Sequence, residues 1–296
     1  MQMLKSQATR DARPLKPDGG APSPMPLIQF DKASLSYGRG DEAVAALAET
    51  DLKVFSGDFV ALVGPSGCGK STILKLVAGL IRASSGYVFV GGREVGAEDV
   101  RIGMAFQNPT LLPWLSIRDN VMLPLKIIAG FREDWRAKKR GEYRQRADAL
   151  LEKVGLGGFG DRFPWQLSGG MQQRASLCRA LIHEPTLLLL DEPFGALDQF
   201  TREELWETLQ SLWMETRPTV LLVTHDLRES AFLANRIVVM SARPGRILVD
   251  ETVPFARPRT MDTMAEPAFV TLNHRLRSLC LLYTSDRCRR YSLCRS

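Results

Sequence analysis

The chain of 296 residues could form one large domain or two small ones, and its hydrophobic content of 45% is ample for a buried core. Its formal net charge is +6, and the mildly basic part of the chain that precedes residue 280 weakly favours a membrane surface or nucleic acid as a neighbour, although a solvated surface is the commoner explanation. No run approaches the roughly 18 apolar residues of a membrane-spanning helix, so we do not expect the chain to cross a bilayer by itself.

The two ends of the chain differ from the rest. Residues 1–26 hold four basic residues and five prolines but no apolar block, so we expect a flexible polar leader rather than a secretory signal. Residues 280–296 lack periodicity and begin with six residues that resemble the translation of a transposase-type sequencing adapter, so we expect a non-native tail. Its four arginines and one aspartate carry +3, which leaves +3 of the +6 for the remainder. The remaining cysteines, Cys68 and Cys178, suit a reducing cytosol.

Short strands are predicted in the segment that leads to a glycine-rich stretch. Ile28–Phe30 and Ala33–Tyr37 alternate as half-buried strands do, Leu47–Val54 follows, and Asp58–Val63 is an apolar strand. Tyr37 has two interpretations that the sequence leaves open. It could offer a flat surface to an adenine ring, or it could be ordinary strand packing.

The stretch Gly64-Pro-Ser-Gly-Cys-Gly-Lys-Ser71 fits G-x-x-x-x-G-K-[S/T], the loop that cradles nucleotide phosphates, and a helical pattern follows it. The glycines let backbone N–H groups turn toward one anion, and the helix adds the positive end of its dipole. We expect Lys70 to reach the β- and γ-phosphates and Ser71 to bind Mg²⁺. The residues expected to contact the nucleotide here are Gly64, Pro65, Ser66, Gly67, Cys68, Gly69, Lys70, Ser71 and Thr72.

Strands are predicted again over Tyr87–Val90 and Ile102–Phe106, and Gln107 directly follows the second of them. A glutamine at this place could reach a metal ion or a water molecule, although a capping or solvent-exposed glutamine is the usual case. Whether Gln107 is a functional residue therefore depends on the side chains that surround it.

From Ser116 to Gly155 the pattern becomes helical. The densely charged part from Arg132 to Arg146 is interpreted as the solvated face of a helix, because no aromatic series accompanies it as nucleic-acid binding would require. Leu111-Leu-Pro-Trp-Leu115 places apolar and aromatic residues around a proline, which favours either a contact knob for a partner or core packing.

The stretch Leu167-Ser-Gly-Gly-Met-Gln-Gln-Arg174 precedes another helical pattern. Ser168 fits a helix N-cap, and Gly169 and Gly170 expose N–H groups that could meet an anion. Because Lys70 already serves the γ-phosphate, a second anion site suggests a second nucleotide or a second copy of the protein. The alternative is a capped helix with a tight entry.

Four leucines, Leu187–Leu190, end in Asp191 and Glu192, as in a buried parallel strand that delivers carboxylates to the edge where open α/β sheets bind ligands. Asp191 is expected to hold Mg²⁺ through its water shell, and Glu192 to orient and deprotonate the attacking water. The strand Thr219–Val223 is followed by His225, which we interpret as a γ-phosphate contact on the same edge.

Over about residues 27–255 this set resembles the ATP-binding-cassette (ABC) ATPase family. Five motifs occur in the family's order: the Walker A loop Gly64–Ser71, the Q-loop Gln107, the signature Leu167–Met171, the Walker B strand Leu187–Glu192 and the switch histidine His225. The resemblance also places Asp198 in the D-loop and Tyr37 in the adenine-stacking position. Met171 stands where the commonest signature has Gln, but the anion-facing residues of the signature are intact.

The resemblance implies an α/β fold of the P-loop NTPase class, with a RecA-like parallel core, an antiparallel β-subdomain and an inserted helical subdomain at about 108–170. Residues 256–279 would be a C-terminal extension. It implies ATP and Mg²⁺ as cofactors, with Ser71, Gln107 and Asp191 around the metal and Glu192, His225 and Gln107 in catalysis. Two copies are expected to sandwich two ATP molecules head to tail. The residues expected to act on the ATP of the other copy are Ser168, Gly169, Gly170 and Asp198.

Finer matches in Phe106–Leu115, Asp191–Asp198 and Ser241–Arg246 resemble the cassettes of bacterial nitrate, sulfonate and taurine importers. This resemblance implies an energy-coupling ATPase subunit at the cytoplasmic face of the inner membrane, with permease subunits and indirectly a solute-binding protein as partners. The knob after Gln107 would then dock a coupling helix of the permease. A cassette for export of lipids or lipoproteins is the stronger alternative, and an ABC ATPase that acts on nucleic acid is a weaker one. No nucleic-acid partner is expected, because neither a long coiled coil nor a second cassette is present. The sequence does not identify the transported solute.

Overall fold

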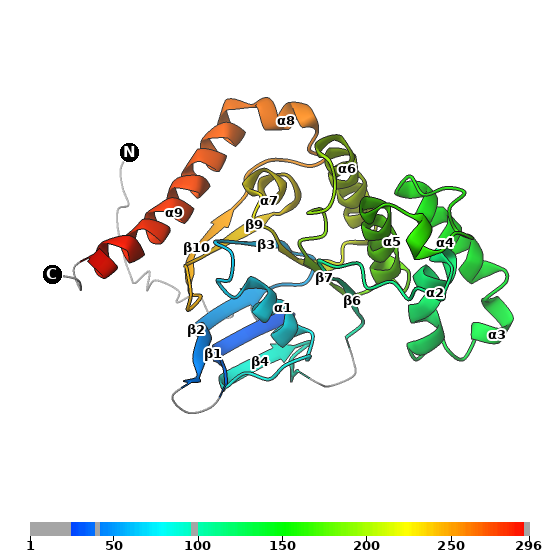
Figure 1. Ribbon diagram of the computed structural model, residues 1–296, viewed down its shortest axis with the longest axis horizontal. Coiled ribbons are helices and arrows are strands. Elements are labelled where there is room, and N and C mark those ends of the chain that lie inside the picture. Colours follow the sequence, from blue (N-terminus) through cyan, green and yellow to red (C-terminus); the bar gives the residue numbers. More distant parts are fainter. Residues whose placement is uncertain (1–24, 39–41, 96–99, 293–296) are drawn as a thin grey trace, which may run out of the picture.

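The computed structural model describes residues 25–38, 42–95 and 100–292, with side chains described as far as Cys280 (Figure 1). The predicted leader lies almost wholly outside the described residues, and so does the end of the predicted tail. Among the described residues, no helix combines the length and the apolar character needed to span a bilayer.

Two sheets form the framework of the described chain. The larger has six strands in the order β10-β9-β3-β8-β7-β6, and all neighbours in it are parallel except β10, which runs antiparallel to β9. Its strands are β3 (Phe59–Val63), β6 (Ile102–Ala105), β7 (Leu187–Asp191), β8 (Thr219–Val223), β9 (Arg236–Met240) and β10 (Ile247–Thr252). The central strands are buried on both faces, which explains why they read as unbroken apolar runs.

The smaller sheet is antiparallel, with four strands in the order β2-β1-β4-β5. Its strands are β1 (Ile28–Tyr37), β2 (Val44–Val54), β4 (Ser85–Val90) and β5 (Arg93–Glu94). The prediction of two strands before Tyr37 was wrong, because β1 runs through both segments. Its pairing register shifts after Phe30, where Lys32 takes a positive φ of 47° and its N–H donates to Asp51 Oδ1 at 3.1 Å.

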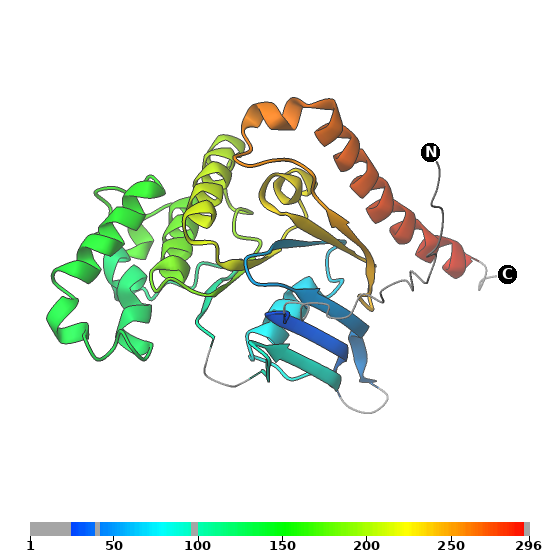
Figure 2. The same cartoon turned by 180° about the vertical axis from the view of Figure 1, so that it is seen from behind.

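Helices cover the two faces of the parallel sheet. α1 (Lys70–Val77) lies between the two sheets, where its apolar residues share one hydrophobic core with both. The opposite face packs against α5 (Gly169–Leu181), α6 (Gln199–Thr216), α7 (Leu227–Leu233) and the start of α9 (Pro267–Ser292). The helices α2 (Ile117–Ile127) and α4 (Glu142–Lys153) join the same hydrophobic core through contacts with α5. Figures 1 and 2 show α8 (Met261–Ala265) and α9 arching over β9 and β10. The predicted α/β fold with a parallel core and an antiparallel sheet is confirmed.

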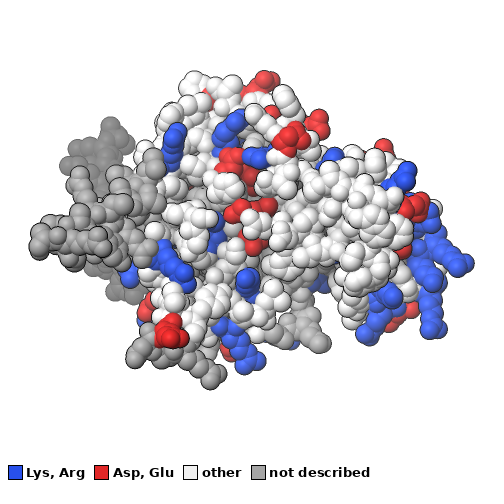
Figure 3. Space-filling view, in the orientation of Figure 1, with Lys and Arg blue, Asp and Glu red and all other residues white. Residues whose placement is uncertain are grey.

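The helical end of the molecule consists of α2, the short α3 (Trp135–Lys138) and α4, and it projects away from both sheets (Figure 2). Lys and Arg side chains gather there in Figure 3, and Arg132, Arg136 and Arg140 are exposed. The solvated charged face predicted for this segment is therefore confirmed. These helices fall within the range 108–170 predicted for the inserted subdomain, whose boundaries stay a prediction.

Candidate functional site

The loop that follows β3 encloses the ammonium of Lys70. Lys70 Nζ donates to the carbonyls of Gly64 and Pro65, each at 2.9 Å, and the residue is 5% exposed. A Cβ at Gly64 would lie 2.7 Å from the Met240 carbonyl oxygen, and one at Gly69, where φ is 103°, would lie 2.9 Å from the Ala46 carbonyl oxygen. Glycine is therefore required at both places, and the loop closes around a fixed positive charge.

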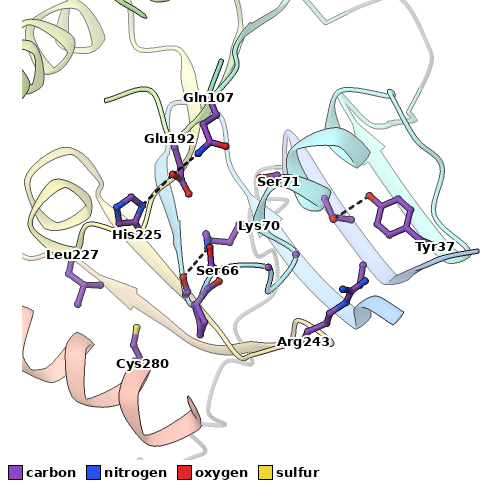
Figure 4. A pocket seen from close by; sticks show the side chains of 16 residues that line it. Tyr37, Ser66, Lys70, Ser71, Gln107, Glu192, His225, Leu227, Arg243 and Cys280 are labelled. Atoms are coloured by element: carbon purple, nitrogen blue, oxygen red, sulfur yellow. Dashed lines mark hydrogen bonds and ion pairs between the residues drawn. The ribbon is translucent and has the colours of Figure 1, made fainter. Parts of the chain in front are cut away.

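A cavity of about 800 Å³ opens beside this loop (Figure 4). It gathers side chains from the ends of several strands, as the predicted nucleotide site requires. Its lining comprises Tyr37, Ala46, Gly64, Pro65, Ser66, Gly67, Gly69, Lys70, Ser71, Thr72, Gln107, Glu192, His225, Leu227, Arg243 and Cys280. Cys68 differs from its neighbours in the loop, because its side chain is fully buried in the core between the sheets and burial raises the pKa of its thiol. Only its backbone is left to face a phosphate.

Ser71 lines this cavity and is hydrogen-bonded to Asp191, which is outside the lining. Ser71 Oγ donates to Asp191 Oδ1 at 2.9 Å, which joins the first turn of α1 to the last residue of β7. Burial raises the pKa of the Asp191 carboxyl, and the hydrogen bond from Ser71 partly offsets this rise.

Gln107, Glu192 and His225 converge on one carboxylate oxygen, although they come from three separate segments (Figure 4). Gln107 Nε2 donates to Glu192 Oε2 at 3.3 Å, and His225 Nδ1 lies 3.3 Å from the same oxygen. Glu192 has a positive φ of 46°, which is uncommon for a residue other than glycine, and its N–H is held by the Val223 carbonyl at 2.9 Å. Such a strained backbone is typical of functional positions.

Tyr37 stands at the far wall of the cavity, at the end of β1. It is 42% exposed, and its hydroxyl lies 3.5 Å from Thr72 Oγ1. Arg243 reaches the same cavity from the turn between β9 and β10, where its Nε donates to the Ala45 carbonyl at 3.2 Å. Sequence reasoning missed Arg243, Ala46 and Leu227 as lining residues, since no local pattern places these segments at the phosphate loop. It also missed Cys280, which belongs to the predicted tail.

Ser168, Gly169, Gly170 and Asp198 are outside the lining of this cavity. Ser168 caps α5, where its Oγ accepts the N–H of Met171 at 3.3 Å. Asp198 caps α6, where its Oδ1 accepts the N–H of Thr201 at 3.1 Å, and this hydrogen bond lowers the pKa of its carboxyl. Within one chain these predicted nucleotide contacts are therefore not part of the cavity that holds the Lys70 loop.

A phosphate loop beside a Walker B strand, with a glutamine and a histidine converging on its glutamate, defines the class of ABC ATPases. The sequence model of the family described as "ABC transporter" matches residues 47–195. The aliphatic sulfonates import ATP-binding protein SsuB of Bacillus licheniformis is 41% identical over 243 residues, which are 81% of this chain and 89% of that protein. The taurine import ATP-binding protein TauB of Shigella sonnei is 41% identical over 231 residues, which are 78% of this chain and 86% of the relative.

The fold is also similar to a solved structure, the dimeric post-hydrolysis state of the ATP-binding cassette MJ0796 bound to ADP and Pi. The TM-score is 0.66 at 31% identity, and the match covers 78% of this chain and all of that one (100%). The chain belongs to the ABC transporter family and is one of its ATP-binding, ATP-hydrolysing subunits.

Proposed function

We propose that this chain is the ATPase subunit of a bacterial importer for a small solute such as an aliphatic sulfonate, taurine or nitrate. The relatives named for sulfonate and taurine import support the class of solute. The observation that carries the ATPase chemistry is the convergence of Gln107 and His225 on Glu192 beside the Lys70 loop.

Each polar group of the cavity has a role in this proposal. Lys70 and the loop N–H groups bind the β- and γ-phosphates, and Tyr37 stacks on the adenine ring. Glu192 orients the attacking water and takes its proton, His225 contacts the γ-phosphate, and Gln107 responds to the occupant of the site. Closure of the site excludes water, so the charges act on the transferring phosphoryl group in a low dielectric.

The oxygen donors expected around the metal ion fit Mg²⁺. Ser71, Gln107 and Asp191 offer a hydroxyl, an amide and a carboxylate oxygen, which are the hard ligands that this ion prefers. Within the described residues, no group of three or more His, Cys, Asp or Glu side chains is placed to hold a metal ion. That composition suits an ion that shares its coordination between a few protein groups, waters and substrate phosphates. When bound, Mg²⁺ would neutralise charge that develops on the phosphates.

A second copy of the chain completes the site in this proposal. Ser168 and Gly169 are exposed at the start of α5 and point their capped helix end outward, so a facing copy can receive them. We therefore propose that the signature residues Ser168, Gly169 and Gly170, together with Asp198 of the D-loop, contact the ATP held by the partner copy.

The variant Glu192→Gln tests the assigned chemistry and the dimer together. It should bind ATP and accumulate as a closed dimer in gel filtration, because the water-activating carboxylate is lost while Lys70 and Asp191 are kept. Turnover should fall to a small fraction of the wild-type rate. A rate close to that of the wild type would exclude Glu192 as the base.

The partners follow from the exposed knob at Leu111–Leu115, where Trp114 is 69% exposed. An apolar aromatic at the surface, next to the segment of Gln107, supports a docking site for a permease subunit. The chain would then work at the cytoplasmic face of the inner membrane, and a solute-binding protein would act through the permease.

Growth of a deletion strain tests the transport role. We expect loss of growth on taurine or alkanesulfonates as sulfur source, or on nitrate as nitrogen source, with normal growth on sulfate and ammonium. The wild-type gene should restore growth and the Glu192→Gln gene should not. Unchanged growth on all three solutes, with a defect in envelope lipids or lipoproteins, would contradict import and favour the export alternative.

A further inference from the structure

Arg202, in the first turn of α6, bridges two loops of the site that are remote in sequence. Its Nη2 donates to the Leu197 carbonyl at 3.0 Å, and its Nη1 lies 3.5 Å from Asp226 Oδ2. Leu197 directly precedes Asp198 of the D-loop, and Asp226 directly follows His225. One guanidinium group therefore contacts both segments at once.

We propose that Arg202 is a positioning residue that fixes the D-loop and the switch-histidine loop as one unit behind Glu192. The inference rests on the proposed roles of Glu192, His225 and Asp198. An arginine suits this task because its planar fork can donate in two directions, whereas a lysine presents a single point charge on a flexible stem.

Asp226, the acidic partner of Arg202, is itself firmly held. Asp226 Oδ1 accepts the N–H of Arg228 at 2.8 Å and that of Glu229 at 3.3 Å, which caps α7, and its own N–H donates to Thr224 Oγ1 at 3.0 Å. A shift of Asp226 would disrupt the start of α7. The link from Arg202 is therefore anchored in the backbone next to His225 rather than in a freely rotating side chain.

The D-loop end of the link is also packed. Leu197 is 6% exposed, and a Cβ at Gly170 of the signature would lie 2.7 Å from Leu197 Cδ2. The carbonyl that accepts the hydrogen bond from Arg202 thus belongs to Leu197, which packs against the signature of its own chain. If the approach of a partner copy moved the signature and the D-loop, the hydrogen bond between the Leu197 carbonyl and the Arg202 guanidinium would change with them.

Arg202 also lies close to the reacting carboxylate. A cavity of about 30 Å³ is lined by Arg202 together with Glu192, Thr224, His225, Asp226 and Glu229. Glu229 is fully buried there, and burial raises the pKa of its carboxyl well above the usual value. Arg202 therefore connects the two loops and is itself one of the residues that surround Glu192 and His225.

A second ion pair between the same two helices provides a matched control. Arg228 of α7 lies 3.5 Å from Glu203 Oε1 of α6, so it connects the helices in the opposite sense. Its side chain is 52% exposed, and it pairs with a side-chain carboxylate rather than with a loop carbonyl. If a link between α6 and α7 were all that mattered, Arg202 and Arg228 would be equivalent.

The test measures steady-state ATP hydrolysis by the purified full chain and its Arg202→Gln, Arg202→Lys and Arg228→Gln variants. We expect Arg202→Gln to lower kcat about tenfold or more while KM for ATP changes by less than about twofold, because ATP contacts are kept and only loop geometry is lost. Arg202→Lys should recover part of kcat, since it can keep one of the two contacts. Arg228→Gln should keep both constants.

Three outcomes would overturn the inference: an unchanged kcat for Arg202→Gln, an equal loss for Arg228→Gln, or an increase in KM that accounts for the whole loss. Should Arg202→Gln not fold, the folded Arg202→Lys variant decides the matter, because a kcat equal to that of the wild type would show that the two-directional fork is dispensable. Failure of the underlying assignment would look different. Glu192→Gln would then turn over normally, whereas failure of this inference leaves the Glu192→Gln defect intact.

Discussion

Ser71 Oγ donates to Asp191 Oδ1 at 2.9 Å, and this bond joins two residues 120 positions apart in the sequence. Burial raises the pKa of the Asp191 carboxyl, so the hydroxyl of Ser71 stabilises its charged form where water has little access. The two residues expected to hold Mg²⁺ are thus already adjacent.

Asp191→Asn should remove the effect of Mg²⁺ on nucleotide binding without removing binding itself. The amide keeps the size of the side chain but lacks the negative charge of the carboxylate that Mg²⁺ prefers as a ligand. Titration with a fluorescent ATP analogue, with Mg²⁺ and with EDTA, measures this. We expect similar affinities in the two conditions for the variant and tighter binding with Mg²⁺ for the wild type. An unchanged enhancement by Mg²⁺ in the variant would refute the assignment.

Lys70→Ala should abolish ATP binding, because the ammonium enclosed by the loop is the fixed positive charge that we propose as the contact of the phosphates. Lys75→Ala is the matched control, since Lys75 lies on the same helix and is exposed. Calorimetric titration with ATP should show no binding for the first variant and wild-type affinity for the second. Equal affinities in both variants would contradict the phosphate-loop assignment.

Tyr37→Ala should weaken ATP binding while Tyr37→Phe should not, because stacking on adenine needs the ring and not the hydroxyl. Base–aromatic stacking is worth about 1–3 kcal/mol, so the affinity of Tyr37→Ala should fall by about 5- to 150-fold. Tyr87→Ala serves as the control, since Tyr87 is a similarly exposed tyrosine on the same sheet. Loss of affinity in Tyr37→Phe would instead point to the contact between its hydroxyl and Thr72.

Motifs that are continuous in the sequence predicted most of this site. The loop from Gly64 to Ser71, and the carboxylates that follow Leu190, carry their chemistry in a fixed order, and parallel strands bring their carboxyl ends to one edge. Arg243 and the bridge from Arg202 to Asp226 could not be predicted in this way. They depend on where a turn and two helices come together in the folded chain, and single arginines carry no periodic signal of that placement.

Trp114→Ala should uncouple transport from ATP hydrolysis. The exposed indole lies away from the nucleotide cavity, so basal ATPase activity of the isolated protein should stay close to that of the wild type. Solute uptake in cells should fall, since a buried aromatic anchor at an interface is among the costliest contacts to lose. Tyr87→Ala, which removes another exposed aromatic, should leave uptake unchanged. Normal uptake in Trp114→Ala would exclude the knob as a docking site.

Glu229→Gln should flatten the dependence of stability on pH. Burial raises the pKa of Glu229, where its carboxyl faces Asp226, Glu192, Arg202 and Thr224, so the folded chain keeps a proton that the unfolded chain releases near the usual pKa of 4.5. The folded state therefore binds more protons above that pH, and linkage requires that this group lowers stability as pH rises toward the folded pKa.

The neutral amide of the Glu229→Gln variant has no proton to release. The loss of stability that the Glu229 carboxyl causes as pH rises is therefore absent from this variant. Thermal unfolding followed between about pH 5 and pH 8 should show a smaller fall in Tm for Glu229→Gln than for the wild type. Glu207→Gln, a change at an exposed position of α6, is the matched control and should follow the wild-type slope. Parallel slopes for Glu229→Gln and the wild type would show that Glu229 is ionised in the fold. Arg202 would then face two charged carboxylates rather than Asp226 alone.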